Sequence, residues 1–548
     1  MNAFLKNKKN ISLFKPEIKQ IIPNHDIILL WNKILHKLQK EVTTVEVYRT
    51  KKVQINKKHV LFEWCTTITS LANNLSNAVR FRQRQVISAA NKTPDLLTQN
   101  EKEILDEFAS AGIHFSDKKK YPFRSDIEKA MRHSKNPDFF AEGMPMQTAQ
   151  HVVIKACEDM ESFFKAMAEY SVAPDKFTGR PEFPGYKRKG GMCTAEITNQ
   201  DCTIKKHKDG KMYAGLPFVK DKPLCIGYID GKLKHVTVTP ANGVFVIGFV
   251  FQKDIDITEQ TGDSCRIAGI DFGVNNMMAV TNNCGLPCLL YKGNIVKSIN
   301  QFYNKKIASI MSLEMQKPDC PVNKNGIPRF VPTQESMSAT LHRNNQVQDF
   351  MLKTVCHLIQ WCVENRIDTI IAGVNTGWKT ESNMTKTNNQ NFIQIPFLYI
   401  RNILRYKCEE HGIKYIEHEE SYTSKASFLD NDPIPVYGKE SGDIKFSGRR
   451  GPLHYKGMYK KDGFRGLYSS ANGTIINSDL NGSANIVRKA IPTAFENGVK
   501  PDFNSVVIIK DPDMEFKLLN SRNQILSQHS VMSESKVRRL KKKITAAA

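Results

Sequence analysis

The chain has 548 residues, more than the roughly 250 to 300 at which a single hydrophobic core stops growing, so a one-domain protein is excluded. Its 79 Lys and Arg outnumber 55 Asp and Glu, and the net charge of +24 is spread along the chain, as is typical of polyanion binders. The 12 cysteines follow no framework spacing, and no apolar run approaches the about 20 residues that span a bilayer, so we expect a soluble, cytoplasmic protein with reduced thiols and no membrane contact.

The N-terminal half predicts strands separated by helices. TTVEVYRTKKVQI (43–55) alternates apolar and polar residues as a strand does. From about Glu63 to Tyr170 the apolar residues recur every three or four positions, which predicts a helical domain. Gly and Pro then punctuate FTGRPEFPGYKRKGG (177–191), and short alternating runs follow as far as Phe251. These runs and the first strand predict a small antiparallel barrel that the helical segment interrupts.

From Cys265 onwards, strand and helix patterns alternate. RIAGIDFG and MMAVT read as strands, and long helices are expected through NIVKSINQFYNKKIASIMSL and VQDFMLKTVCHLIQWCVEN. Strand DTIIAG, helix IPFLYIRNILRYKCEEHG and strand IKYIEHEES follow, and this alternation predicts an α/β layered fold. The end of the chain is strongly basic between Lys536 and Lys543, where we expect a disordered tail with at most non-specific phosphate attraction.

Two aspartates stand where an α/β fold exposes carboxylates. Asp271 ends the apolar strand in RIAGIDFG, and Asp479 lies just before or within the first turn of the helix predicted from NSDLNGSANIVRKA. Each has an ordinary alternative, a turn Asp beside Gly and an N-cap Asp. Together, an early GIDFG strand and a late DLNGSANI helix are the layout of an RNase H-like nuclease, in which separated carboxylates hold two divalent ions about 4 Å apart.

These motifs carry a resemblance to a known family. GIDFGVNNMMAV looks like the first RuvC motif of TnpB and the related compact type V CRISPR effectors, and SDLNGSANIVRKA looks like their third. FTGRPEFPGYKRKGG with AEITNQ is similar to the barrel segment of that family, and IPFLYIRNILRYKCEEHGIKYIEHEESYTSK to the stretch that leads into its YTS signature, here Tyr422, Thr423 and Ser424. The resemblance spans roughly residues 60 to 492, and the ordered combination is specific although each piece is short.

The third acid departs from the usual family pattern. The second motif is usually a strand that ends in Glu, but the strand DTIIAGVNTGWK has Gly373 at that place. IEHEESYTSK supplies Glu417, Glu419 and Glu420 instead, which resembles the relocated acid of one TnpB branch and of the eukaryotic Fanzor relatives. There the acid stands three residues before the Thr, which selects Glu420. Strand alternation places Glu419 with Glu417 on the opposite face. Glu419 is the alternative, and a solvated strand face is the alternative for all three.

The family usually carries a CxxC…CxxC zinc ribbon after YTS, and this sequence does not. Cys408 is the last cysteine, and Cys284 with Cys288 has no second pair, so we expect no zinc. The stretch from Lys425 to Ser470 is instead basic and aromatic. It suits contact with single-stranded nucleic acid through phosphates and base stacking, or equally an ordinary polar insertion.

The resemblance implies a multidomain α/β fold: an RNase H-like RuvC nuclease domain, and a small antiparallel β-barrel (wedge) domain with an inserted α-helical recognition domain. The expected segments are an N-terminal extension (1–45), the barrel (46–62 and 171–262), the helical domain (63–170), the nuclease domain (263–425 and 471–492), a basic insert in place of the zinc ribbon (426–470) and a C-terminal extension (493–548).

The resemblance also implies an RNA-guided DNA endonuclease, which cuts target DNA after guide RNA pairing and recognition of a short flanking motif. Asp271, Glu420 and Asp479 would be its catalytic residues and the ligands of two Mg²⁺ ions, because a hard cation suits oxygen-only ligands. Guide RNA and double-stranded target DNA would be the partners of a chain expected to be monomeric. The sequence leaves open whether the guide comes from a transposon end or a CRISPR array.

Two other functions are compatible with parts of the sequence. An RNA-guided DNA-binding repressor with an inactive nuclease domain is motivated by Gly373, although three candidate acids argue against it. A DNA-joining transposase is disfavoured, because the chain lacks a His-hydrophobic-His pair and its acids are not spaced as in a DDE integrase.

Overall fold

The computed structural model describes residues 42–90, 92–116, 119–258, 265–375, 390, 392–436 and 445–513. These residues fall into two compact units. The N-terminal unit comprises the described residues of Glu46–Asp254 and of Pro321–Leu341, and the C-terminal unit comprises the described residues of 42–45, of Ile255–Cys320 and from His342 to Asp513. Most of the predicted N-terminal extension and the basic tail lie outside the described residues. No helix in the described ranges is long and apolar enough to cross a membrane.

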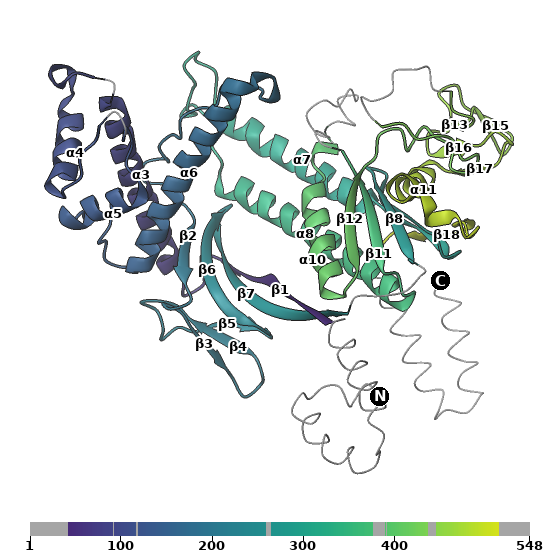
Figure 1. The fold of residues 1–548 in the computed structure, drawn as a ribbon, viewed down its shortest axis with the longest axis horizontal. Coiled ribbons are helices and arrows are strands. Elements are labelled where there is room, and N and C mark those ends of the chain that lie inside the picture. Colours follow the sequence, from purple (N-terminus) through teal and green to yellow (C-terminus); the bar gives the residue numbers. More distant parts are fainter. Residues whose placement is uncertain are drawn as a thin grey trace, which may run out of the picture. The chain divides into compact units, whose positions relative to one another are not determined.

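The N-terminal unit has the predicted chain order, with helices between its first two strands (Figure 1). One sheet has the order β1-β7-β6-β2, and a second has the order β3-β4-β5. The strands are β1 (Val42–Ile55), β2 (Ala195–Thr198), β3 (Thr203–Lys206), β4 (Met212–Gly215), β5 (Leu224–Gly227), β6 (Lys232–Ala241) and β7 (Val244–Thr258). The helices are α3 (Phe62–Ala89), α4 (Gln99–Ser110), α5 (Arg124–His133) and α6 (Met146–Val172), with short 3₁₀ turns at Pro94–Leu96 and Pro174–Lys176.

The helices and strands of this unit share one hydrophobic core. Ile68 of α3, Val153 of α6 and Phe249 of β7 are buried in the same cluster. The sequence predicted two separate domains here, whereas the packing is continuous between them. A closed wedge barrel and a distinct recognition domain therefore stay predictions.

The C-terminal unit is built on one mixed sheet with the order β12-β11-β8-β9-β10-β18. The first three strands in sequence pair antiparallel, β11 and β12 add in parallel beside β8, and β18 adds in parallel beside β10. The bounds are β8 (Ile267–Phe272), β9 (Asn276–Asn282), β10 (Pro287–Lys292), β11 (Thr369–Val374), β12 (Lys414–Glu419) and β18 (Asp502–Ile509). The sequence predicts a C-terminal extension over 493–548, outside the nuclease domain. Within it, β18 (502–509) pairs with β10, with Val507 opposite Leu289, so this strand belongs to the sheet.

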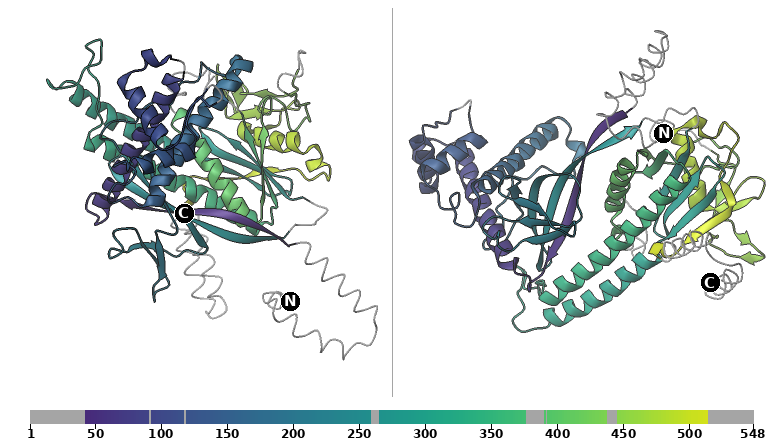
Figure 2. Two further views of the ribbon diagram at one scale, coloured as in Figure 1. Left: turned by 60° about the vertical axis from the view of Figure 1, so that its left-hand side comes forward. Right: turned by 90° about the horizontal axis from the view of Figure 1, so that it is seen from below.

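Helices cover both faces of this sheet (Figure 2). Alternation along β11 points Ile370 to one core with Met351 and Ile403, and Ile371 to another with Ile486. The helices are α7 (Asn294–Met315), α8 (Gln334–Glu364) and α10 (Phe397–Glu410), and α11 (Ser478–Ala490) with a 3₁₀ turn at Pro492–Phe495. Helices α8 and α10 pack on the first face and α11 on the second, so the carboxyl ends of β8, β11 and β12 open beside the N-terminus of α11.

The basic segment at 426–470 folds without cysteine ligands. Strands β13 (Arg449–Arg450), β16 (Leu467–Ser469) and β17 (Ile475–Asn477) form a small sheet, and β14 (His454–Tyr455) pairs with β15 (Met458–Tyr459). The fully buried Tyr468 donates its hydroxyl to the Lys425 carbonyl at 2.7 Å. The Asp432 carboxylate accepts from the backbone amides of Ser427 and Ser447. Buried hydrogen bonds therefore hold the base of this segment.

Candidate active site

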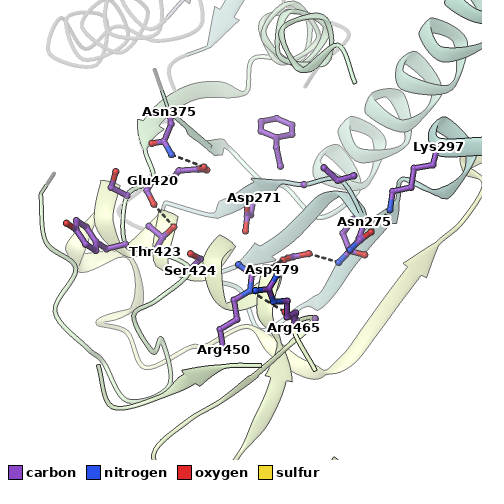
Figure 3. A pocket seen from close by; sticks show the side chains of 17 residues that line it. Asp271, Asn275, Lys297, Asn375, Glu420, Thr423, Ser424, Arg450, Arg465 and Asp479 are labelled. Carbon is purple, nitrogen blue, oxygen red and sulfur yellow. Dashed lines mark hydrogen bonds and ion pairs between the residues drawn. The ribbon is translucent and has the colours of Figure 1, made fainter. Parts of the chain in front are cut away.

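A cavity of about 590 Å³ opens at the ends of β8 and β12 and the start of α11, and all three predicted acids line it. Figure 3 shows the side chains of Asp271, Glu420 and Asp479 around this space. The remaining lining residues are Phe272, Gly273, Val274, Asn275, Asn276, Lys297, Asn375, Ser421, Tyr422, Thr423, Ser424, Arg450, Arg465 and Gly466. The fold thus brings together acids that stand far apart in the sequence.

Asp271 lies near the end of a largely buried strand. β8 pairs with β9 on one side, where Asp271 lies opposite Ala279, and with β11 on the other as far as Ile270, so the backbone leading to Asp271 is held on both sides. Burial raises the pKa of the Asp271 carboxyl well above its ordinary value, and the charges of Glu420 and Asp479 raise it further. Arg450 opposes this rise only in part. The cavity therefore concentrates negative charge around Asp271, which favours a bound cation.

Asp479 is oriented by two neighbours and is not the helix cap. Asn477 caps α11, because its side-chain oxygen accepts from the amides of Asp479 and Leu480 at 3.0 and 3.2 Å. The Asp479 carboxylate is therefore available to the cavity, where it accepts from the Asn276 side chain at 2.7 Å and from Arg450 at 3.2 Å. Lys292 in turn donates to the Asn276 oxygen at 2.7 Å.

The three glutamates near the end of β12 have different surroundings, and only Glu420 lines the cavity. Glu417 pairs with Arg401 of α10 at 2.5 Å. Glu419 pairs with Lys489 of α11 at 2.6 Å. Burial opposes ionisation of Glu419, but hydrogen bonds from Lys489 and Ser421 outweigh it, and the pKa of Glu419 is lowered. The structure therefore places Glu420, not the alternative Glu419, with the other two acids.

Gly373 leaves the space that Glu420 uses. A Cβ atom added at Gly373 would lie 2.6 Å from Glu420 Oε2 and would also clash with Ile486. Asn375, two residues further on, donates its side-chain amide to Glu420 at 3.2 Å. The glycine at the usual acid position and the acid at 420 are thus sterically coupled, because a side chain at the first place would displace the carboxylate from the second.

The residues around Asp479 fasten α11 to the rest of the site. A Cβ on Gly482 would lie 2.5 Å from Asp271 Oδ2, so the close approach of α11 to β8 requires glycine there. Ser483 donates to the Gly269 carbonyl of β8 at 2.8 Å. The buried side chains of Asn481 and Asn485 donate to the Ala426 carbonyl at 2.8 and 2.7 Å, which ties the loop after Glu420 to the helix. The motif DLNGSAN therefore supplies one acid and the contacts that bring three acids together.

Several lining residues were not singled out from the sequence. Asn276 and Lys297 lie near GIDFG but follow no catalytic spacing, and Arg465 is one of many cations in a basic stretch. Arg450 stood among the basic residues of the insert, and only the paired strands β13 and β16 explain its contact with Asp479.

The donor set of the cavity fits a hard divalent cation, since it offers three carboxylates and side-chain amides. Burial, and then the charges of Glu420 and Asp479, raise the pKa of Asp271, so a cation bound among the three acids would favour their ionised forms. Across the described ranges, no three His, Cys, Asp or Glu side chains are already grouped as metal ligands. The carboxylates share the cavity without closing around a common point.

Comparisons with known proteins show which families the chain resembles. Residues 251–379 match the family OrfB_IS605, described as "Probable transposase", and residues 397–486 match the Cas12f1-like TNB domain. The TnpB-like protein ORF457 of Acidianus two-tailed virus is 25% identical over 268 residues, which cover 47% of this chain and 50% of the relative. The chain thus matches about half the length of that relative. These matches confirm the resemblance to TnpB and compact type V effectors predicted from the motifs.

Solved structures of similar proteins include a Cas12f1-sgRNA-target DNA complex, with 13% identity, a TM-score of 0.28, and coverage of 81% of this chain and 100% of that one. Another is the mini-RNA-guided endonuclease CRISPR-Cas phi3, with 9% identity, a TM-score of 0.38, and coverage of 81% and 92%.

Proposed function

We propose that this protein is an RNA-guided DNA endonuclease that hydrolyses phosphodiester bonds of target DNA with an RNase H-like, RuvC-type site. The observation that carries the proposal is the convergence of Asp271, Glu420 and Asp479 from three separate elements into one cavity. A guide RNA would read the target by base pairing, and the protein would recognise a short flanking motif. The matches to the OrfB_IS605 and Cas12f1-like TNB families support this reading.

The three carboxylates would hold two Mg²⁺ ions. Bound there, divalent ions would activate a water molecule and stabilise charge on the leaving oxygen, so no protein nucleophile is needed. Asp271 would hold the ions together with Glu420 and Asp479, whose side chains line the same cavity. Asn276 and Asn375 would keep Asp479 and Glu420 oriented toward the ions.

Three cations of the lining would position the scissile phosphate. Arg450 and Arg465 come from the basic insert, and Lys297 comes from α7. The Arg450 side chain is 46% exposed while it pairs with Asp479, so its guanidinium can also donate to a substrate phosphate. This assigns the insert a direct part in binding the strand that is cut.

The alternative, a guided repressor with an inactive nuclease domain, was motivated by Gly373. The closeness of position 373 to the Glu420 carboxylate weakens the repressor hypothesis, because Glu420 supplies a carboxylate in nearly the same space as the one missing from β11. An active site with three acids is the simpler reading of the cavity.

The test begins with the RNA that copurifies with the protein. Sequencing it identifies the guide, and a duplex matched to the guide is then offered in Mg²⁺ and in EDTA. We expect cleavage only in Mg²⁺, none by an Asp271→Ala variant, and equal target binding by both proteins. Binding without cleavage by the parent in every divalent metal would favour the repressor.

A further inference from the structure

The segment 177–191 has little secondary structure of its own and is held by side chains of α3. The Asn77 side chain makes two hydrogen bonds with the backbone of Lys187, as a paired strand would. Its oxygen accepts from the Lys187 amide at 2.8 Å, and its nitrogen donates to the Lys187 carbonyl at 3.1 Å. One turn earlier, the buried Asn73 donates to the Arg188 carbonyl at 3.0 Å. Arg84 donates to the Pro184 carbonyl at 3.2 Å. The spacing of these positions along α3 follows one helix face and fixes the backbone of the segment.

Aromatic contacts fix the first part of the segment as well. Phe183 packs against Phe163 of α6, with ring centroids 5.2 Å apart. The Arg84 guanidinium lies 5.0 Å from the Phe183 ring and 5.2 Å from the Tyr186 ring. Tyr186 is therefore oriented from one side, while half of its surface, 50%, remains exposed.

The fixed backbone presents consecutive cations to solvent. Lys187, Arg188 and Lys189 are all exposed, and none of them has an ion pair within the described part of the chain. Lys155, an exposed lysine of the same unit, is by contrast paired with Glu158 at 3.0 Å. Three uncompensated charges on an ordered backbone, next to an exposed ring, are the combination that binds a nucleic-acid strand through phosphates and stacking.

We propose that Tyr186, Lys187, Arg188 and Lys189 form a nucleic-acid-strand contact surface that α3 holds in its binding conformation. The three cations meet successive phosphates, and the Tyr186 ring packs on a base or sugar of the same strand. Asn77 is a positioning residue, because it touches only the backbone of Lys187. The inference rests on the proposed function only in taking nucleic acid as the ligand.

The charge test uses full-length protein freed of RNA and measures fluorescence anisotropy in EDTA across a range of NaCl concentrations. The probes are one labelled sequence as single-stranded RNA, single-stranded DNA and RNA–DNA heteroduplex. Lys187→Gln/Arg188→Gln/Lys189→Gln should weaken binding by about 10- to 100-fold and reduce the salt slope by about 2 to 3, near one per phosphate contact. The probe that loses most affinity identifies the strand.

A matched triple variant controls for net charge. Lys205, Lys206 and Lys208 are equally exposed and lie in the same unit, on β3 and the turn after it. Lys205→Gln/Lys206→Gln/Lys208→Gln should change affinity and salt slope much less. Equal losses in the two triple variants, or none in the first, would overturn the proposal.

The positioning role has its own control. Asn77→Ala keeps every cation and should still weaken binding, by about fivefold, because the Lys187 backbone is no longer fixed. Asn74→Ala, on the exposed side of the same helix, should not. Both variants should melt at nearly the same temperature as the parent. The binding assay contains no metal, so its outcome is independent of cleavage. If the variants bind as the parent does, the cleavage proposal still stands, and if the parent does not cleave, the binding result still stands.

Discussion

Strand β12 carries two acids, Glu417 and Glu419, on its flank, and the cavity at its end is lined by three more. The acids of the flank and those of the cavity differ in their partners. On the flank, Glu417 and Glu419 are compensated by Arg401 and Lys489, and hydrogen bonds from those cations help to lower the pKa of each acid. In the cavity, which begins one residue further on with Glu420, burial raises the pKa of Asp271, and the neighbouring carboxylates of Glu420 and Asp479 raise it further. A carboxylate used for structure and one available to a cation therefore differ in their partners, which the identity of the residue does not reveal.

The largest effect should separate neighbouring glutamates. Glu420→Gln should reduce the rate of target cleavage by about a thousand-fold or more, because it removes a charged group from the reacting centre. Glu419→Gln should leave the rate within about tenfold but destabilise the fold by about 1 kcal/mol, because Lys489 loses its partner. Single-turnover cleavage and thermal melting measure the two effects. The comparison fails if Glu419→Gln is the variant that stops cleavage.

A smaller effect is expected at Gly373. Gly373→Ala should lower cleavage by about 10- to 100-fold, because the new Cβ displaces the Glu420 carboxylate by a fraction of an ångström or more. Ile486→Val, combined with it, removes the clash on the helix side only. The double variant should therefore recover thermal stability but not cleavage. If it recovers cleavage, the steric coupling between positions 373 and 420 is wrong.

The two hydrogen bonds that link Lys292 to Asn276 and Asn276 to Asp479 should contribute less to the cleavage rate. Lys292→Met removes the ammonium that donates to the Asn276 side-chain oxygen, so Asn276 orients Asp479 less well and cleavage should fall by about tenfold. The loss should shrink as Mg²⁺ is raised, because a weaker site fills at higher concentration. Lys305→Met, which removes an exposed lysine of α7, serves as the control. A loss of cleavage that does not depend on the Mg²⁺ concentration would mean that these hydrogen bonds do not support the metal site.

The smallest effect concerns stability. A raised pKa means that folding disfavours the ionised form of Asp271, so in EDTA at neutral pH the neutral Asp271→Asn should raise the melting temperature by about 2 to 4 °C. Glu417→Gln should lower it, because Arg401 and Arg405 lose their partner. Mg²⁺ should stabilise the parent more than Asp271→Asn. Lower stability of Asp271→Asn would contradict the contrast between flank and cavity.

Much of the C-terminal unit could be predicted from local patterns. The apolar run before Asp271 and the periodic helix after Asn477 indicated strand and helix, and the resemblance indicated that their acids meet. Strand β18 could not be predicted, because it pairs with β10 more than two hundred residues earlier and carries no motif. The pairing of Glu419 with Lys489 was equally hidden, since alternation alone placed Glu419 beside Glu417. The role of Gly373 could not be predicted from the sequence, because it depends on the distance between this position and the Glu420 side chain in the folded protein.

The most direct test of the account is where the metal binds. Anomalous diffraction from Mn²⁺ in crystals of the protein with its guide and target, with Asp271 replaced by Asn to prevent cutting if needed, locates the ions. We predict peaks within the cavity bounded by residues 271, 420 and 479, two of them about 4 Å apart in the parent protein. Mn²⁺-dependent cleavage by a protein whose peaks lie elsewhere would contradict the proposed site.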